Sequence, residues 1–290
     1  MPMNYEELLK NSSEQSGNCA CIGIDIVPEL LPENCSVDTF IEIFLGELYE
    51  RKLIPAAFKP NIAYFSSFNQ AYRGNFSGYM SLSKMIALIR KLFPHVPIIL
   101  DAKRGDIASS STRYAMEIFE SWTADATTVS PYMGHDSVLP FRNGFENKGV
   151  YVLNRTSNKG AVDLQNQELK NGQTVYMEVA RQILEYAKAF SGTGAVVGAS
   201  SLKELRDIAQ IYRNTREVPL LIPGVGAQGG SAVDVIACLK ELQYDLRLVR
   251  INSSSGLTFP WKKEKIAPND WLAICMNCVE KFLQETRMNE

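Results

Sequence analysis

Histidine is scarce in this sequence: the chain of 290 residues has two, His95 and His135. Neither belongs to a His-x-x-x-His or Glu-x-x-His pattern, the spacings that put two metal ligands on one face of a helix. The scarcity of histidine therefore argues against a transition-metal site, and we expect no metal in the chemistry of this protein.

Cysteine is also infrequent, with six residues in all. Cys19 and Cys21 alternate with Ala20 in an apolar stretch, as on one face of a buried strand. Cys275 and Cys278 form a lone C-x-x-C inside a helical pattern, without the second ligand pair of a zinc site or the strand-to-helix setting of a redox motif. We interpret the cysteines as free packing thiols, which fits the cytoplasm.

Long apolar runs and an excess of charge of one sign are missing as well. No segment reaches the roughly 18 uncharged apolar residues of a membrane helix, and the opening MPMNYEE lacks the basic and apolar regions of a signal peptide. The formal net charge of −2 provides no basic surface for nucleic acid or anionic lipid. These absences predict a cytoplasmic protein that binds neither membrane nor nucleic acid.

The sequence does contain short apolar runs that alternate with longer amphipathic stretches. Eight runs are rich in Val, Ile and Leu, as parallel strands covered on both faces should be: 19–25, 55–62, 97–103, 124–130, 149–155, 194–199, 218–223 and 245–251. Helical patterns lie between them, at 38–50, 79–93, 106–121, 172–190, 202–213 and 268–287. The alternation predicts an α/β fold, a single (β/α)8 TIM barrel over residues 1–290.

The carboxyl ends of barrel strands form the active site in this architecture. Polar residues stand at those ends: Asp25 in the first run, Lys59 and Asn61 in the second, Asp101, Lys103 and Asp106 at the third, and Ser130 at the fourth. The glycine-rich PGVGAQGG (223–230) follows the seventh run, and NSSSG (252–256) follows the eighth. Two long loops without a pattern, 156–171 and 252–266, are expected to be functional.

Asp101 and Lys103 are two residues apart, so they share one face of their strand. The apolar run before them, 97–100, places that face at the mouth of the barrel, and Lys59 ends the neighbouring strand at the same height. Buried charges are costly unless they are paired. The group is therefore either an ion-pair lattice that ties strand ends together or a catalytic network, and Asp106 with Lys59-Pro60-Asn61 favours catalysis.

The stretch DAKRGDI (101–107) resembles the D-x-K-x-x-D signature of the orotidine monophosphate decarboxylase family. Further blocks resemble the family in the same order: CIGIDIVPELLP (21–32), FKPNIAYF (58–65), TVSPYMGHDSVLPF (128–141), TSNKG (156–160) and PGVGAQGG (223–230). These blocks span nearly the whole chain, and DAKRGDI with SPYMG is similar to the longer bacterial-type branch.

The resemblance implies cofactor-free decarboxylation of orotidine 5'-monophosphate to uridine 5'-monophosphate (UMP) by a homodimer with shared active sites. Loss of CO2 leaves a carbanion at C6 of the pyrimidine, which positioned cations must stabilise. By resemblance, Lys103 stabilises and protonates this carbanion, Asp101 crowds the substrate carboxylate, and Lys59 touches the ribose and extends the alternating Lys–Asp–Lys–Asp chain. Asp106 and Ile107 are implied to enter the partner subunit's site.

The family pattern also implies contacts for substrate binding. Asp25 and Asn61 would hold ribose hydroxyls or neighbouring network groups, and Ser130 would bond the pyrimidine edge. Ser110 would approach the ligand of the partner subunit. Phosphate would lie at the loops after strands seven and eight, held by backbone N–H groups at Gly224 and Gly226 and by the side chain of Gln228, although such a glycine-rich loop is also common as a plain tight turn.

One position departs from the family pattern. The family has an arginine that grips phosphate in a run like N-S-S-R-G, and this chain has Ser255 there. Arginine pairs with phosphate through charge-assisted and often bidentate hydrogen bonds. Another cation, Lys159 or Arg250, replaces the arginine, or else phosphate affinity is weaker.

Two alternatives stay open. A sugar-phosphate lyase of the same superfamily shares D-x-K-x-x-D but needs Mg2+ and further acidic ligands, and Lys59-Pro60-Asn61 with SPYMG favours the pyrimidine. A catalytically impaired nucleotide-binding barrel would explain Ser255, but Lys59, Asp101, Lys103 and Asp106 are all present. The chain has no phosphoribosyltransferase-like half, so a fusion to or complex with such a partner also stays open.

Overall fold

All eight expected strands form in the computed structural model, which describes residues 3–226 and 229–288. Each is short and mostly buried, in keeping with its apolar sequence. The strands are β1 (Ala20–Ile24), β2 (Ala57–Pro60), β3 (Ile99–Arg104), β4 (Ala126–Val129), β5 (Gly149–Arg155), β6 (Thr193–Val197), β7 (Leu220–Ile222) and β8 (Val249–Ser253).

The strands are parallel and follow the order β2-β1-β8-β7-β6-β5-β4-β3. The two end strands of this order also meet, through parallel bridges that join Phe58 to Ile98 and Asn61 to Asp101. This β2–β3 seam closes the sheet into a barrel, so the predicted TIM barrel is confirmed.

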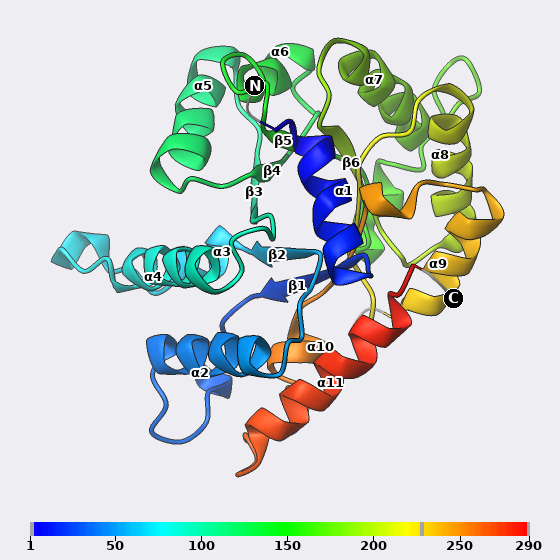
Figure 1. The fold of residues 1–290 in the computed structure, drawn as a ribbon. Coiled ribbons are helices and arrows are strands. Elements are labelled where there is room, and N and C mark those ends of the chain that lie inside the picture. Colours follow the sequence, from blue (N-terminus) through cyan, green and yellow to red (C-terminus); the bar gives the residue numbers. More distant parts are fainter. Residues whose placement is uncertain (1–2, 227–228, 289–290) are drawn as a thin grey trace.

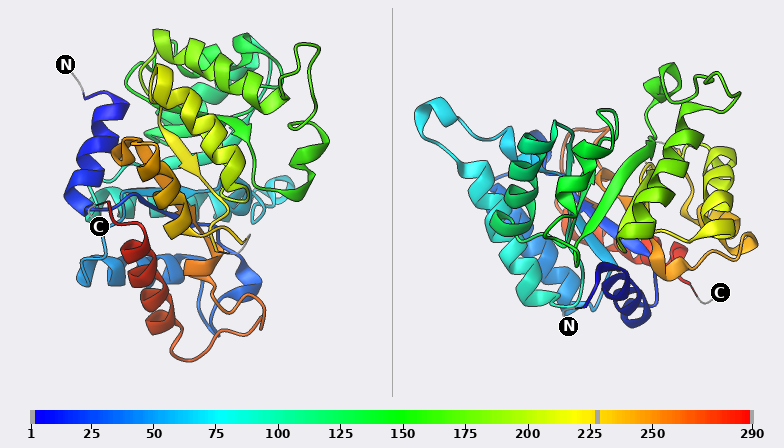
Figure 2. Two further views of the ribbon diagram at one scale, coloured as in Figure 1. Left: turned by 90° about the vertical axis from the view of Figure 1, so that its right-hand side faces the viewer. Right: turned by 90° about the horizontal axis from the view of Figure 1, so that it is seen from above.

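Helices lie outside the strands and cover them (Figures 1 and 2). The predicted helical patterns correspond to α2 (Val37–Glu50), α4 (Ser77–Leu92), α5 (Ala108–Met116) with a π-helical turn (Glu117–Ser121), α7 (Val175–Ala189), α8 (Leu202–Thr215) and α11 (Trp271–Glu285). The remaining α-helices of the described residues are α1 (Tyr5–Ser16), α3 (Ile62–Ser66), α6 (His135–Val138), α9 (Ala232–Glu241) and α10 (Ser255–Thr258). No helix within the described ranges is long and apolar enough to cross a membrane.

Helix α1 was not predicted, and it fills the amino-terminal end of the barrel (Figure 1). Asn4 and Glu7 form a reciprocal capping box, with each side chain accepting from the backbone N–H of the other at 3.0 Å. Gly17 ends the helix with a φ of 71°. Tyr5 and Leu9 are fully buried and pack against inward-facing residues of the strands, so α1 closes this end of the barrel.

Arg250 on β8 is fully buried and binds α1 from inside the barrel. Its guanidinium donates to the Leu9 carbonyl at 2.7 Å, to Ser13 Oγ at 2.9 Å and to the Ala56 carbonyl at 3.1 Å. These partners lie at the amino-terminal ends of the strands, opposite to the expected site. The idea that Arg250 replaces the missing phosphate-binding arginine is therefore wrong, because its side chain is committed to the other end.

We predict that Arg250→Met destabilises the fold, because several buried oxygen atoms lose a charged donor. Hydrogen bonds to charged groups contribute about 1.5–3 kcal/mol each, so the free energy of unfolding in urea should fall by about 3 kcal/mol or more.

The matched control is Arg247→Met, three residues earlier. Arg247 is partly exposed and forms ion pairs with Asp245 and Glu14, which are worth at most about 1 kcal/mol at a surface. Equal losses in the two variants would contradict the role assigned to Arg250.

Candidate active site

The centre of the site is the carboxylate of Asp101, which lies between two lysines across the β2–β3 seam. Lys59 Nζ donates to Asp101 Oδ2 at 3.0 Å, and Lys103 Nζ donates to Oδ1 at 2.7 Å. Lys59 is 3% exposed and Asp101 is 6% exposed, whereas half of the Lys103 side chain is exposed. The three side chains thus form a continuous ion-paired row that ends in a partly free ammonium group.

Neighbouring charges keep the buried members of this row ionised. Burial alone would raise the pKa of Asp101, but Lys59, Lys103 and the hydroxyl of Thr128 together hold that pKa well below its usual value. Burial alone would lower the pKa of Lys59, but the carboxylates of Asp101 and Asp25 raise it above its usual value. Both groups therefore carry fixed charges at neutral pH.

An irregularity in β3 sets the position of Lys103. The pairing of β3 with β4 shifts register between Leu100 and Arg104, and Lys103 has a φ of 44°, in the left-handed region. Such bulges re-aim side chains near active sites. The backbone N–H of Lys103 donates to Thr128 Oγ1 at 2.9 Å, which fixes the altered backbone to β4.

A cavity of about 740 Å³ opens over this row at the carboxyl ends of the strands. Among the expected site residues, its lining includes Asp25, Lys59, Asp101, Lys103, Gly224 and Ser255. Apolar side chains of β5, β6 and β7 contribute to the same lining: Leu153, Val196 and Leu221. A charged row beside an apolar wall suits a ligand that has a flat ring and an anionic substituent.

Another group of expected site residues does not line the cavity within the described part of this single chain. Asn61 caps α3, with Oδ1 accepting from the Ala63 N–H at 3.0 Å. Ser130 is half-buried, and its Oγ accepts from the Tyr132 N–H at 3.4 Å. The others are Asp106, Ile107, Ser110 and Gly226.

Asp106 and Ile107 follow β3 and turn outward. Asp106 Oδ1 accepts from the Ile107 N–H at 2.8 Å, and Ile107 is 56% exposed. Gly226 is exposed beside the cavity residue Val225. Gln228, expected to contact phosphate, lies outside the described residues.

Thr128 and Lys262 are among the residues of the cavity lining that were not predicted as site residues from the sequence. Lys262 follows Trp261, whose buried indole N–H donates to the Leu30 carbonyl at 2.9 Å. The indole also packs edge-on against Phe259. These contacts anchor the backbone next to Lys262. Lys262 lines the cavity together with Ser254, Ser255 and Gly256, whereas Lys159 is not among the lining residues described.

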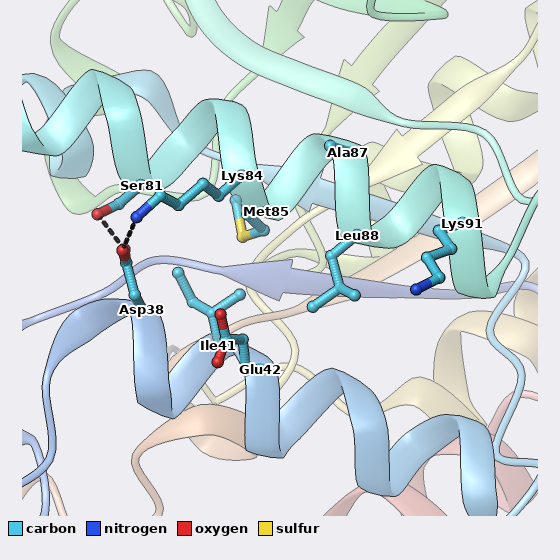
Figure 3. A pocket seen from close by; sticks show the side chains of 9 residues that line it. All are labelled: Asp38, Ile41, Glu42, Ser81, Lys84, Met85, Ala87, Leu88 and Lys91. Carbon is cyan, nitrogen blue, oxygen red and sulfur yellow. Dashed lines mark hydrogen bonds and ion pairs between the residues drawn. The ribbon is translucent and has the colours of Figure 1, made fainter.

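A second cavity, of about 380 Å³, lies between α2 and α4 (Figure 3). There Asp38 accepts from Ser81 Oγ and from Lys84 Nζ, both at 2.5 Å. All of its lining residues belong to these two helices. It is a groove in the outer layer of helices, and we assign no chemistry to it. Across residues 3–226 and 229–288, no group of three or more His, Cys, Asp or Glu side chains could hold a metal ion.

A family model described as the orotidine 5'-phosphate decarboxylase / HUMPS family matches residues 51–242. This chain belongs to that family. It is 38% identical over 262 residues to a protein of Delftia acidovorans named orotidine 5'-phosphate decarboxylase, covering 89% of this chain and 90% of the relative. The resemblance noted in the sequence is confirmed.

Solved structures of the family have the same fold. The OMP decarboxylase of Leishmania donovani is similar with a TM-score of 0.73 and 28% identity, covering 98% of this chain and 99% of that one. The UMP synthase of the same organism is similar with a TM-score of 0.74 and 29% identity. The match covers 98% of this chain but 56% of the synthase, so the barrel corresponds to part of that longer protein.

Proposed function

We propose that this protein is a carboxy-lyase that converts orotidine 5'-monophosphate to UMP without a cofactor, in the last step of de novo pyrimidine synthesis. The observation that carries the proposal is the row Lys59–Asp101–Lys103 at the mouth of the barrel. Membership of the decarboxylase family, and relatives 37–39% identical that bear this name, support the same reaction.

The proposed chemistry depends on two residues of the row that line the cavity, Lys103 and Asp101. When the bond from C6 to the carboxylate breaks, CO2 leaves and its electron pair stays on C6. The ammonium of Lys103 stabilises that pair as a positioned cation and then transfers a proton to C6. Asp101, kept ionised by its neighbours, repels the substrate carboxylate, and the departure of CO2 relieves this repulsion.

The remaining groups hold the ribose and the row itself. Lys59 binds the second oxygen of Asp101 and so prevents this carboxylate from rotating toward Lys103 alone. Asp25 Oδ1 is buried at the cavity without a hydrogen-bond partner among the described residues. A ribose hydroxyl would supply the donor that this oxygen lacks. Roles for Asn61 at the ribose and Ser130 at the pyrimidine edge stay predictions.

A second copy of this chain would complete the site. Exposed apolar side chains occur on the segments that follow β2, β3 and β4, as expected of a protein interface: Tyr72, Phe76, Met80, Ile107, Tyr132 and Met133. Asp106 and Ser110 lie on the same side, next to Ile107, and would reach the partner's ligand from there. The proposed assembly is a homodimer with shared sites. The cytoplasm is the proposed compartment, because all six cysteines are free thiols.

The phosphate would lie at the wall formed by Gly224 and Ser255, away from the lysine row. Lys59 and Lys103 are both bound to Asp101, whereas Lys262 lines the same cavity as Gly224 and Ser255. Lys262 therefore takes the phosphate-binding role of the arginine that the family has at the position of Ser255. Binding energy at this remote group would orient the pyrimidine over Lys103.

We predict that the purified protein decarboxylates orotidine 5'-monophosphate after treatment with EDTA, and that Lys103→Ala lowers turnover at least about 10³-fold. The variant should keep its circular dichroism spectrum and Tm. Lys203→Ala, an exposed change on α8, is the control and should have wild-type turnover.

Each alternative has its own outcome in this experiment. Turnover that EDTA removes and Mg2+ restores would favour the sugar-phosphate lyase. Wild-type protein that binds UMP without any turnover would be the impaired nucleotide-binding barrel. A Lys103→Ala variant with a tenth of wild-type turnover would show that another residue is the catalytic acid.

Mixing Asp106→Ala protein with Lys103→Ala protein should restore part of the activity once subunits exchange. If Asp106 serves the partner's site, a mixed dimer contains one site with both changes and one site with neither. The control mixture is Lys59→Ala with Lys103→Ala, since these residues serve the same chain and every mixed site stays defective. Verified exchange without recovery in the first mixture would show that Asp106 serves its own chain.

Lys262→Ala should lower kcat/KM for orotidine 5'-monophosphate by about 10- to 100-fold, the equivalent of one charge-assisted hydrogen bond. The phosphate-free nucleoside should be affected much less. Adding Ser255→Arg should restore activity in this variant, because it returns a guanidinium to the position where the family has one. A large gain from Ser255→Arg in the wild type would instead show that the phosphate site lacks a cation. Lys263→Ala is the matched control. A loss in Lys159→Ala but not in Lys262→Ala would identify Lys159 as the phosphate-binding cation instead.

A further inference from the structure

Thr128 on β4 contacts the charged row Lys59–Asp101–Lys103, although its own side chain carries no charge. Its side chain is buried, with the residue 1% exposed, and lies at the cavity. The hydroxyl donates to Asp101 Oδ1 at 2.7 Å and accepts from the backbone N–H of Lys103 at 2.9 Å. It therefore contacts both residues that face the reacting carbon in the proposed reaction.

These contacts belong to a closed ring of hydrogen bonds that joins Thr128, Asp101 and Lys103. A hydroxyl has one proton, and because Oγ1 accepts from the Lys103 N–H, that proton is directed at Asp101. Asp101 Oδ1 also accepts from Lys103 Nζ at 2.7 Å, so Lys103 is bound to the same oxygen through its own ammonium and, by way of Thr128, through its backbone.

The ring coincides with the irregular part of β3. Lys103 has a φ of 44°, which non-glycine residues rarely adopt. The regular ladder between β3 and β4 is interrupted there, between Leu100 and Arg104. The Thr128 hydroxyl supplies an acceptor to a backbone N–H at this interruption, and thereby favours the conformation that turns the Lys103 side chain back toward Asp101.

We propose that Thr128 is a positioning residue, which aligns the Lys103 ammonium and the Asp101 carboxylate for the decarboxylation proposed above, on which this inference rests. The alternative is that Thr128 only joins β3 to β4. Thr127 next to it offers a comparison, because it is equally buried and its hydroxyl donates to the Leu100 carbonyl at 2.9 Å, away from the charged row.

The test compares Thr128→Val, Thr128→Ser and Thr127→Val with the wild type. Thr128→Val preserves shape and removes the hydroxyl, so kcat should fall by up to about 100-fold, as misplacement of a reacting group does. The inhibition constant for UMP should stay within a few-fold, because Thr128 acts through its neighbours. Thr128→Ser keeps the hydroxyl and should retain most of kcat. Thr127→Val should lower Tm without a comparable loss of kcat.

Crystal structures of wild type and Thr128→Val give a readout that does not depend on activity. We expect Lys103 in the variant to leave the left-handed region or its Nζ to separate from Asp101. If the wild type is active, an unchanged kcat in Thr128→Val would overturn the proposal for Thr128 alone. An equal loss of kcat in Thr128→Ser and Thr128→Val would also overturn it. An inactive wild type would refute the proposed function, and an unaltered Lys103 in the variant structure would then refute the positioning role as well.

Discussion

The site depends on one buried carboxylate held between two ammonium groups. A charge at the position of Asp101 is tolerated in the protein interior only because Lys59 and Lys103 occupy its two oxygens. Lys59 comes from β2 and Asp101 from β3, and these are the strands whose meeting closes the barrel. Side chains alternate between the two faces of a strand, so a slip of one residue at this seam would turn Lys59 away from Asp101. The pairing of β2 with β3 that closes the barrel therefore also brings Lys59 to Asp101.

Residues at the amino-terminal end of the barrel stabilise the fold, and residues at the carboxyl end form the candidate active site. At the amino-terminal end, α1 inserts Tyr5 and Leu9 and supplies oxygens to the buried guanidinium of Arg250. That charge is bound by neutral oxygen atoms, which are backbone carbonyls and the hydroxyl of Ser13. At the carboxyl end, the row of charges lines a cavity large enough for a nucleotide. Because α1 seals one end, a ligand can enter from the other.

Much of this arrangement could be predicted from the sequence, because it follows from local rules. Continuous apolar runs identified the eight strands, and the alternation of side chains placed Asp101 and Lys103 on one face. Helix α1 could have been found from its capping box and Gly17. Lys262 could not, since its position depends on a contact between Trp261 and Leu30, 231 residues apart. The contact of Thr128 with Lys103 depends on the irregularity in β3, which the residue types at 99–104 do not predict.

Three departures from ordinary protein structure meet at the carboxyl end of the barrel, and together they support its function. Lys103 adopts a backbone conformation that is unfavourable for a side chain with a Cβ atom. Asp25 Oδ1 is buried without a described donor, and Ile107 presents an apolar side chain to water. The first is stabilised within the chain by the Thr128 hydroxyl, whereas the second would be relieved by a substrate hydroxyl and the third by a second subunit. Strained conformations, and groups that a chain cannot satisfy alone, cluster where a ligand or partner binds.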